Sequence, residues 1–153
     1  MNIATALAAI EDALNRPFPK EKVDEGCFAA DQSGPGCHLL DLACANDCFD
    51  LDDDLESYRA AQHQYDSDLA DLQTALRARW GEGELLTLWG DSDLPPPVQV
   101  AEYAPVLRMI AEYIPALRIW RRGERWIGVF VGQEDRELPL QLRVAVGLVS
   151  ELP

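Results

Sequence analysis

Four cysteines lie close together in the first half of the chain, and their thiolates are ligands that zinc accepts. They are Cys27, Cys37, Cys44 and Cys48, with His38 beside the second of them. Successive cysteines are separated by nine, six and three residues, whereas structural zinc sites usually contain pairs separated by two to four. Only Cys44 and Cys48 form such a pair. We therefore expect all four thiols to be reduced and free of metal, filling core space as free cysteines often do.

A run of carboxylates follows the cysteines and raises the question of a calcium site. It consists of Asp50, Asp52, Asp53, Asp54 and Glu56. An EF-hand loop needs Gly at its sixth position and Glu at its twelfth, and counting from Asp50 these positions hold Leu55 and Ala61. We interpret the run as an exposed helix start, where the macrodipole favours negative charge and Asp53 and Glu56 have capping-box spacing. Such a surface is also suited to protein binding.

Arginine and tryptophan alternate around a predicted tight turn in the second half. The segment 120–126 reads Trp-Arg-Arg-Gly-Glu-Arg-Trp. Because Trp and Arg are enriched in binding hot spots, we predict that Trp120, Arg122 and Trp126 contact a partner. The structural alternative is a cross-strand pair with one aromatic side chain packed inward.

Sequence motifs of the common enzyme classes are missing from the chain. It has no G-x-S-x-G, no H-E-x-x-H and only two histidines, and the glycine-rich segment 33–36 lacks a P-loop lysine. We therefore predict a non-enzymatic protein without a cofactor or a metal. A small enzyme that uses buried carboxylates remains an open alternative.

The negative charge is concentrated in the first half of the chain. Residues 1–76 contain 16 acidic and four basic side chains, while residues 77–153 contain 11 and nine. The net charge of −14 repels nucleic acid and anionic membranes, and it attracts basic proteins. We expect a basic protein partner, and neither nucleic acid nor membrane.

The length of 153 residues and a hydrophobic content of 48% fit a single globular domain over residues 1–153. The N-terminal segment lacks the basic region of a secretory signal, and no apolar run reaches the roughly 18 residues of a membrane span. We therefore expect a cytoplasmic protein.

The first half, 1–80, is predicted to be mostly helical and acidic. Ile3, Leu7, Ile10 and Leu14 recur at helical spacing, so a first helix should end before Pro17. Residues 17–36 are rich in Pro and Gly and are predicted to be loop, and 38–48 to form one or two helical turns. A heptad-like series of mostly apolar residues predicts a long helix over 52–79. The series could form a coiled-coil seam, but its polar Gln62 and its short length favour packing on the domain's own sheet.

The second half, 81–153, is predicted to be mixed, with a C-terminal β-meander. We expect a strand at 84–89, helix in two pieces over 98–113, and a hairpin of 117–121 and 125–131. The strict alternation over 138–148 predicts a strand with one buried and one wetter face, so Val144→Asp should destabilise severely and Arg143→Asp mildly. A repeat of 101–108 at 111–118 has no assigned role. The predicted fold class is α+β: a single domain with an antiparallel sheet packed against a long helix and shorter N-terminal helices.

The C-terminal third resembles the small acidic immunity proteins of bacterial polymorphic toxin systems. The residues that carry the resemblance are the hairpin around Trp120 with the segment 122–126, and the loop 132–139 that leads into the last strand. The resemblance covers about 35 residues and implies a cytoplasmic, single-domain protein that binds a cognate toxin domain.

Together these observations predict an inhibitor of immunity or antitoxin type, which neutralises a toxin domain through an acidic surface. The predicted partner-binding residues are Asp50, Asp52, Asp53, Asp54, Glu56, Trp120, Arg122 and Trp126. The alternative is a non-enzymatic adaptor in which a metal bound by the cysteines stabilises the first half.

Overall fold

A computed structural model describes residues 1–24, 31–44, 55–89, 104–133 and 139–153 of the chain. In these ranges the helices are α1 (Ile3–Asn15), α2 (Leu55–Trp80), α3 (Pro105–Ala111) and the short 3-10 helix η2 (Val149–Glu151). The strands are β1 (Val23–Asp24), β2 (Gln32–Gly34), β3 (Cys37–Cys44), β4 (Glu84–Thr87), β5 (Ala116–Arg122), β6 (Arg125–Gly132) and β7 (Gln141–Leu148). The fold is α+β, as the sequence predicts.

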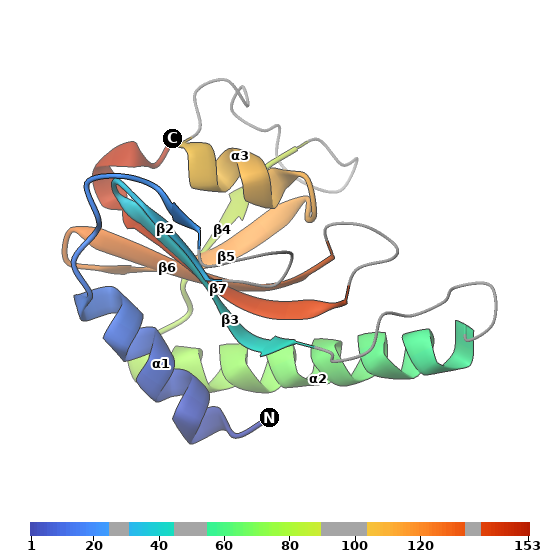
Figure 1. The fold of residues 1–153 in the computed structure, drawn as a ribbon. Helices are drawn as coiled ribbons and strands as arrows, with labels where there is room; N and C mark the ends of the chain where they lie inside the picture. The colour runs from blue at the N-terminus through green and yellow to red at the C-terminus, as the bar shows by residue number, and fades with distance from the viewer. Residues whose placement is uncertain (25–30, 45–54, 90–103, 134–138) are drawn as a thin grey trace.

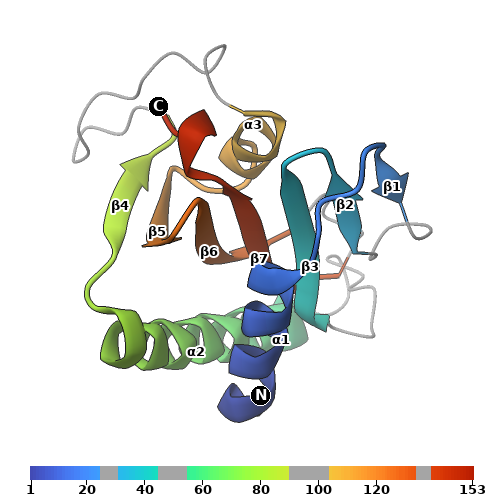
Figure 2. The ribbon, with the colours of Figure 1, turned by 90° about the vertical axis from the view of Figure 1, so that its left-hand side faces the viewer.

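All seven strands form one antiparallel sheet in the order β1-β2-β3-β7-β6-β5-β4. Helices α1 and α2 cover one face of this sheet, and α3 covers the other (Figures 1 and 2). The core is accordingly divided in two. One cluster lies under α1 and α2, and the other lies under α3.

The first helix ends before Pro17, as its sequence predicts. The side chain of Asn2 accepts a hydrogen bond from the Thr5 amide at 3.1 Å, which satisfies one of the free N–H groups at the helix start. Ala6, Ile10 and Ala13 are buried against the sheet. None of the described helices combines the length and the hydropathy that a membrane span requires.

The C-terminal meander is confirmed. Strands β5 and β6 are joined by a two-residue turn in which Gly123 has a φ of 63°, the positive value that such hairpin turns require at their first position. Strand β6 pairs in turn with β7, with Val129 opposite Val144. The second helical piece of 98–113 is also confirmed as α3, whose first residue is Pro105. Residues 98–103 lie outside the described ranges.

Two predictions for the first half are wrong. Residues 38–44 of the segment predicted to be helical belong to strand β3, and the predicted loop over 17–36 contains the short strands β1 and β2. Strand β3 lies between β2 and β7, so Leu39 and Leu40 are both buried although they point to opposite faces. A strand buried on both faces has no alternation, and a short apolar run of this kind cannot be distinguished from a helix by its period.

The alternating strand β7 also differs from its prediction, because both of its faces are buried. It lies at the centre of the sheet between β3 and β6, and helices cover it on both sides. Arg143, which we placed on a wetter face, is only 2% exposed. The expected mild effect of Arg143→Asp is therefore wrong.

Candidate functional site

The predicted acidic surface is described in part. Asp50, Asp52, Asp53 and Asp54 lie outside the described residues, so the structure does not place them. Glu56 lies in the first turn of α2 and is exposed. Its position agrees with the predicted acidic helix start.

Helix α2 is divided into two halves by its contacts. Its fully buried residues, Leu72 and Leu76, are both in the C-terminal half, where they pack in the core beneath the sheet. The N-terminal half has no fully buried residue, and Leu55 is 47% exposed. In Figure 1 this half of α2 reaches beyond the ends of the strands. It therefore presents most of its surface outward.

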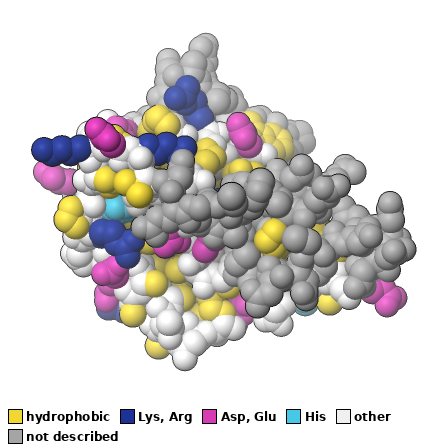
Figure 3. Space-filling model, viewed as in Figure 1, with side chains coloured by type: hydrophobic (Ala, Val, Ile, Leu, Met, Phe, Trp, Pro, Cys, Tyr) yellow, Lys and Arg dark blue, Asp and Glu magenta, His cyan; other side chains and the backbone are white. Residues whose placement is uncertain are grey.

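Described acidic side chains do not gather into one patch on the face shown in Figure 3. There they are interspersed with arginine, lysine and apolar side chains. In the sequence, the densest run of carboxylates is the segment directly before α2, which lies outside the described residues.

The prediction that Trp120 and Trp126 contact a partner is wrong, because both tryptophans belong to the core. Trp120 is 2% exposed in the cluster under α1 and α2, and its indole Nε1 donates to the Gly81 carbonyl at 2.8 Å. Trp126 is completely buried in the cluster under α3, where Gly147 leaves the space that its ring fills. A partner cannot reach either ring in this fold.

Arg122 is the one predicted hairpin residue that is exposed. Its guanidinium carbon lies 5.2 Å from the centroid of the Trp80 ring, within the range of a cation–π interaction. This contact joins the hairpin to the C-terminal end of α2, at the opposite end of the helix from Glu56. The structure therefore does not bring Arg122 and Glu56 into one site.

The cysteines cannot act as one set of ligands. Cys37 and Cys44 lie at opposite ends of β3, and seven strand steps separate them by about 23 Å, whereas zinc–sulfur bonds are about 2.3 Å long. In the described ranges Cys37 is free of a disulfide, and no three potential ligands cluster. Burial, reinforced by the Glu151 carboxylate, raises the pKa of the Cys37 thiol, which keeps it protonated and weakly nucleophilic. Cys27 and Cys48 lie outside the described residues.

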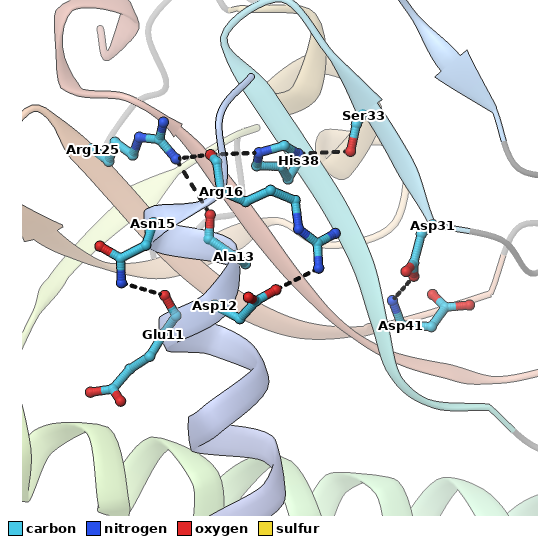
Figure 4. Close-up of polar contacts among 10 residues, drawn as sticks. All are labelled: Glu11, Asp12, Ala13, Asn15, Arg16, Asp31, Ser33, His38, Asp41 and Arg125. Carbon is cyan, nitrogen blue, oxygen red and sulfur yellow. Dashed lines mark hydrogen bonds and ion pairs between the residues drawn. The ribbon is translucent and has the colours of Figure 1, made fainter. Parts of the chain in front are cut away.

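A buried histidine joins three segments that are distant in sequence (Figure 4). His38 Nδ1 lies 2.7 Å from the Ser33 hydroxyl, and Nε2 lies 3.2 Å from the carbonyl oxygen of Arg16. Because a carbonyl only accepts, Nε2 carries the proton and Nδ1 accepts from Ser33. Phe18 stacks beside the ring at a centroid distance of 4.8 Å. Burial lowers the pKa of His38, so the ring is neutral.

Arg125 completes this polar cluster at the end of α1. Its Nη1 donates to the carbonyls of Leu14 at 2.9 Å and Arg16 at 2.6 Å, and its guanidinium lies over the Phe18 ring. A cation at this position satisfies terminal carbonyls and complements the helix macrodipole. Since His38 is 1% exposed and both of its ring nitrogens are occupied, we assign the cluster to holding α1 on the sheet.

A second polar cluster is buried between β3 and β7. Arg143 Nε lies 2.8 Å from Asp41 Oδ1, and Gln141 Nε2 donates to Asp41 Oδ2 at 2.9 Å. Asp31 accepts from the Asp41 amide at 3.0 Å (Figure 4), and β3 is irregular just after Asp41. Burial raises the pKa of Asp41, and the Arg143 charge opposes that rise.

A groove of about 460 Å³ lies between α2 and the sheet, and its volume is in the range of ligand pockets. One side of α2 forms its wall, and the ends of β5 and β6 form its floor. Tyr58 closes the N-terminal end of the wall by donating to Gln133 Oε1 at 3.1 Å. The groove-lining residues on α2 are Tyr58, Gln62, Asp66, Leu69 and Gln73.

The sequence contained a signal for this groove that we used only as an argument against a coiled coil. The series predicted to pack on the sheet includes polar Gln62 among apolar residues, and Asp66 and Gln73 lie on the same side of the helix. Polar residues on a sheet-facing side indicate that the helix does not pack closely there. The buried pair of Asp41 and Arg143 had no comparable signal, because it depends on the pairing of β3 with β7.

No protein-family model, no curated protein and no solved structure matches this chain.

Proposed function

We propose that this protein is a non-enzymatic inhibitor of immunity or antitoxin type, which binds a basic toxin domain in the cytoplasm of a bacterium. The observation that carries the proposal is the exposed N-terminal half of α2. Helices in proteins are stabilised mainly by tertiary packing of one face, and this half has no fully buried residue to supply it. A surface of this kind is suited to packing against another protein.

The charge of the same region defines the partner. Residues 47–71 contain nine acidic side chains and one basic side chain. Such a local field accelerates association with a positively charged surface and disfavours nucleic acid. A toxin domain with a basic active site would be covered and inhibited by it. The resemblance of the C-terminal third to immunity proteins supports the same class of partner.

Site-specific photocrosslinking in bacterial cells that contain the gene tests this proposal. A crosslinking residue replaces Ala60, which is exposed in the N-terminal half of α2, or Thr74, which is exposed about 21 Å further along the helix. These positions are nearly four turns apart, so they point to similar sides. We expect position 60, and not position 74, to capture a basic protein whose toxic activity falls in the complex. Equal capture at both positions, or none at position 60, would contradict the proposal.

A further inference from the structure

We propose that the groove between α2 and the sheet binds an extended, basic peptide segment of the partner. The inference rests on the proposed function and assigns part of the partner to this site. Three properties of the groove carry it: its length, the hydrogen-bonding groups of its wall, and its charge.

The groove extends along α2. Its wall on α2 runs from Tyr58 to Gln73, fifteen helical steps or about 22 Å. An extended peptide rises about 3.3 Å per residue, so six or seven residues would match this length. A small compact ligand would leave most of the wall without a contact.

The wall of the groove suits the backbone of a peptide, and the floor suits its side chains. Gln62 and Gln73 present side-chain amides, which both donate and accept as the peptide backbone does. Val129 and Val131 of β6 contribute to the floor, which suits aliphatic side chains. The groove therefore offers partners both for the backbone and for the aliphatic side chains of a bound peptide.

The charges that line the groove favour a basic segment. Asp66 on α2 and Glu112 after α3 are both exposed, and Gln62 Nε2 donates to Asp66 Oδ1 at 3.1 Å. Arg118 is the cation among the lining residues, and its Nη1 donates to the Glu82 carbonyl at 3.1 Å. Among the described lining residues, two carboxylates and one guanidinium leave a negative lining in a protein of net charge −14. Arginine or lysine side chains of a bound peptide would complement it.

The probe for the test is a fluorescein-labelled heptapeptide in which arginine alternates with valine, and fluorescence anisotropy at physiological salt measures its binding. The comparison peptide has glutamine in place of every arginine. Asp66→Asn removes a charge from the groove, and its matched control, Asp71→Asn, removes the same charge from an exposed position of α2 that does not line it. Ala116→Trp and Gln73→Trp fill the groove from the floor and from the wall, and circular dichroism checks that both variants fold.

We expect Asp66→Asn to weaken binding of the arginine peptide about three- to fivefold and Asp71→Asn less than about twofold. Either tryptophan variant should abolish binding, and the glutamine peptide should bind more weakly than the arginine peptide. The groove assignment would be overturned if the arginine peptide did not bind the unaltered protein. It would also be overturned if the two Asn variants lost equal affinity for the peptide and neither tryptophan variant lost any. If a partner captured at position 60 binds Ala116→Trp normally, the groove assignment fails while the proposed function stands. If position 60 captures no partner while the peptide still binds, the proposed function fails and the groove assignment stands.

Discussion

Arg143 and Asp41 face each other across β7 and β3, where β7 is buried on both faces and Asp41 is partly buried. The ion pair replaces water as the partner of each charge, and Gln141 adds a hydrogen bond to the carboxylate. Removing one member leaves the other charged, buried and unpaired, which costs far more than the pair itself contributes.

This arrangement gives a prediction at the residue scale. Arg143→Met should lower the free energy of unfolding by about 3–5 kcal/mol, because it leaves the Asp41 carboxylate without its cation. Adding Asp41→Leu to that variant should recover most of the loss, since no buried charge then remains. Urea denaturation measures both effects. The control is Arg121→Met, which breaks an exposed pair with Glu84 and should cost at most about 1 kcal/mol; a similar loss for both arginines would contradict the account.

His38 gives a second prediction, in which pH is varied. Burial lowers its pKa in the folded state below the ordinary value of about 6.5 that applies to the unfolded chain. Below pH 6.5 the unfolded chain therefore binds the extra proton first, and stability falls as pH decreases toward the folded-state pKa. The slope should not exceed about 1.4 kcal/mol per pH unit for one proton. Denaturation between pH 7.5 and 5 should show this loss, and His38→Gln, which does not titrate, should lack it.

Asp41 has the opposite effect on the pH dependence of stability, at lower pH. Its pKa is raised by burial, so the folded state binds a proton before the unfolded chain does, and acidification through that range favours folding. The His38 effect is confined to pH values below about 6.5 and disappears with His38→Gln, which separates the two groups. If His38→Gln lost as much stability between pH 7.5 and 5 as the unaltered protein does, the assignment of this loss to His38 would be contradicted.

The positions of the two tryptophans could have been predicted from the hairpin itself. A two-residue turn at Gly123 and Glu124 pairs Arg122 with Arg125, and hence Arg121 with Trp126 and Trp120 with Ile127. Trp120 and Trp126 then point to opposite faces of the sheet, and cannot form one surface. Composition alone, on which we based the partner-binding prediction, does not contain that information.

At the scale of elements, helix α2 combines a packed half and an exposed half. Leu72→Ala should cost about 2–5 kcal/mol of unfolding free energy, because the side chain is completely buried in the core under the sheet. Leu55→Ala removes the same atoms from a site that is 47% exposed and should cost well under 1 kcal/mol. Thermal and urea denaturation measure the pair. A large loss for Leu55→Ala would mean that the N-terminal half packs within this chain rather than against a partner.

The elements that sequence could predict are those with a signal in their own segment. Helix α1 has an apolar stripe, a cap and a following proline, and the hairpin of β5 and β6 has a turn glycine between two apolar segments. Strand β3 and the faces of β7 could not be predicted in this way, because both strands are central and buried on both sides. Their burial depends on pairing between segments about 100 residues apart, which no local pattern encodes.

At the scale of the whole molecule, the elements that stabilise the fold are distinct from the surface that we assign to the partner. The two core clusters, the capped end of α1 and the buried pair lie in and around the sheet. The N-terminal half of α2, together with the acidic segment that the sequence places before it, is the part that we assign to the partner. Substitutions there should change binding while leaving the stability of the sheet nearly unchanged.

The most direct test of that assignment is the rate of association with the captured partner, measured by stopped-flow at several salt concentrations. Neutralising Asp52, Asp53, Asp54 and Glu56 to Asn or Gln should slow association several-fold at low salt and flatten its salt dependence, because long-range attraction is screened beyond about 8 Å at physiological ionic strength. The loss of a helix cap, worth about 1 kcal/mol, is the expected limit of the effect on stability. An association rate equal to that of the unaltered protein at every salt concentration would contradict the account.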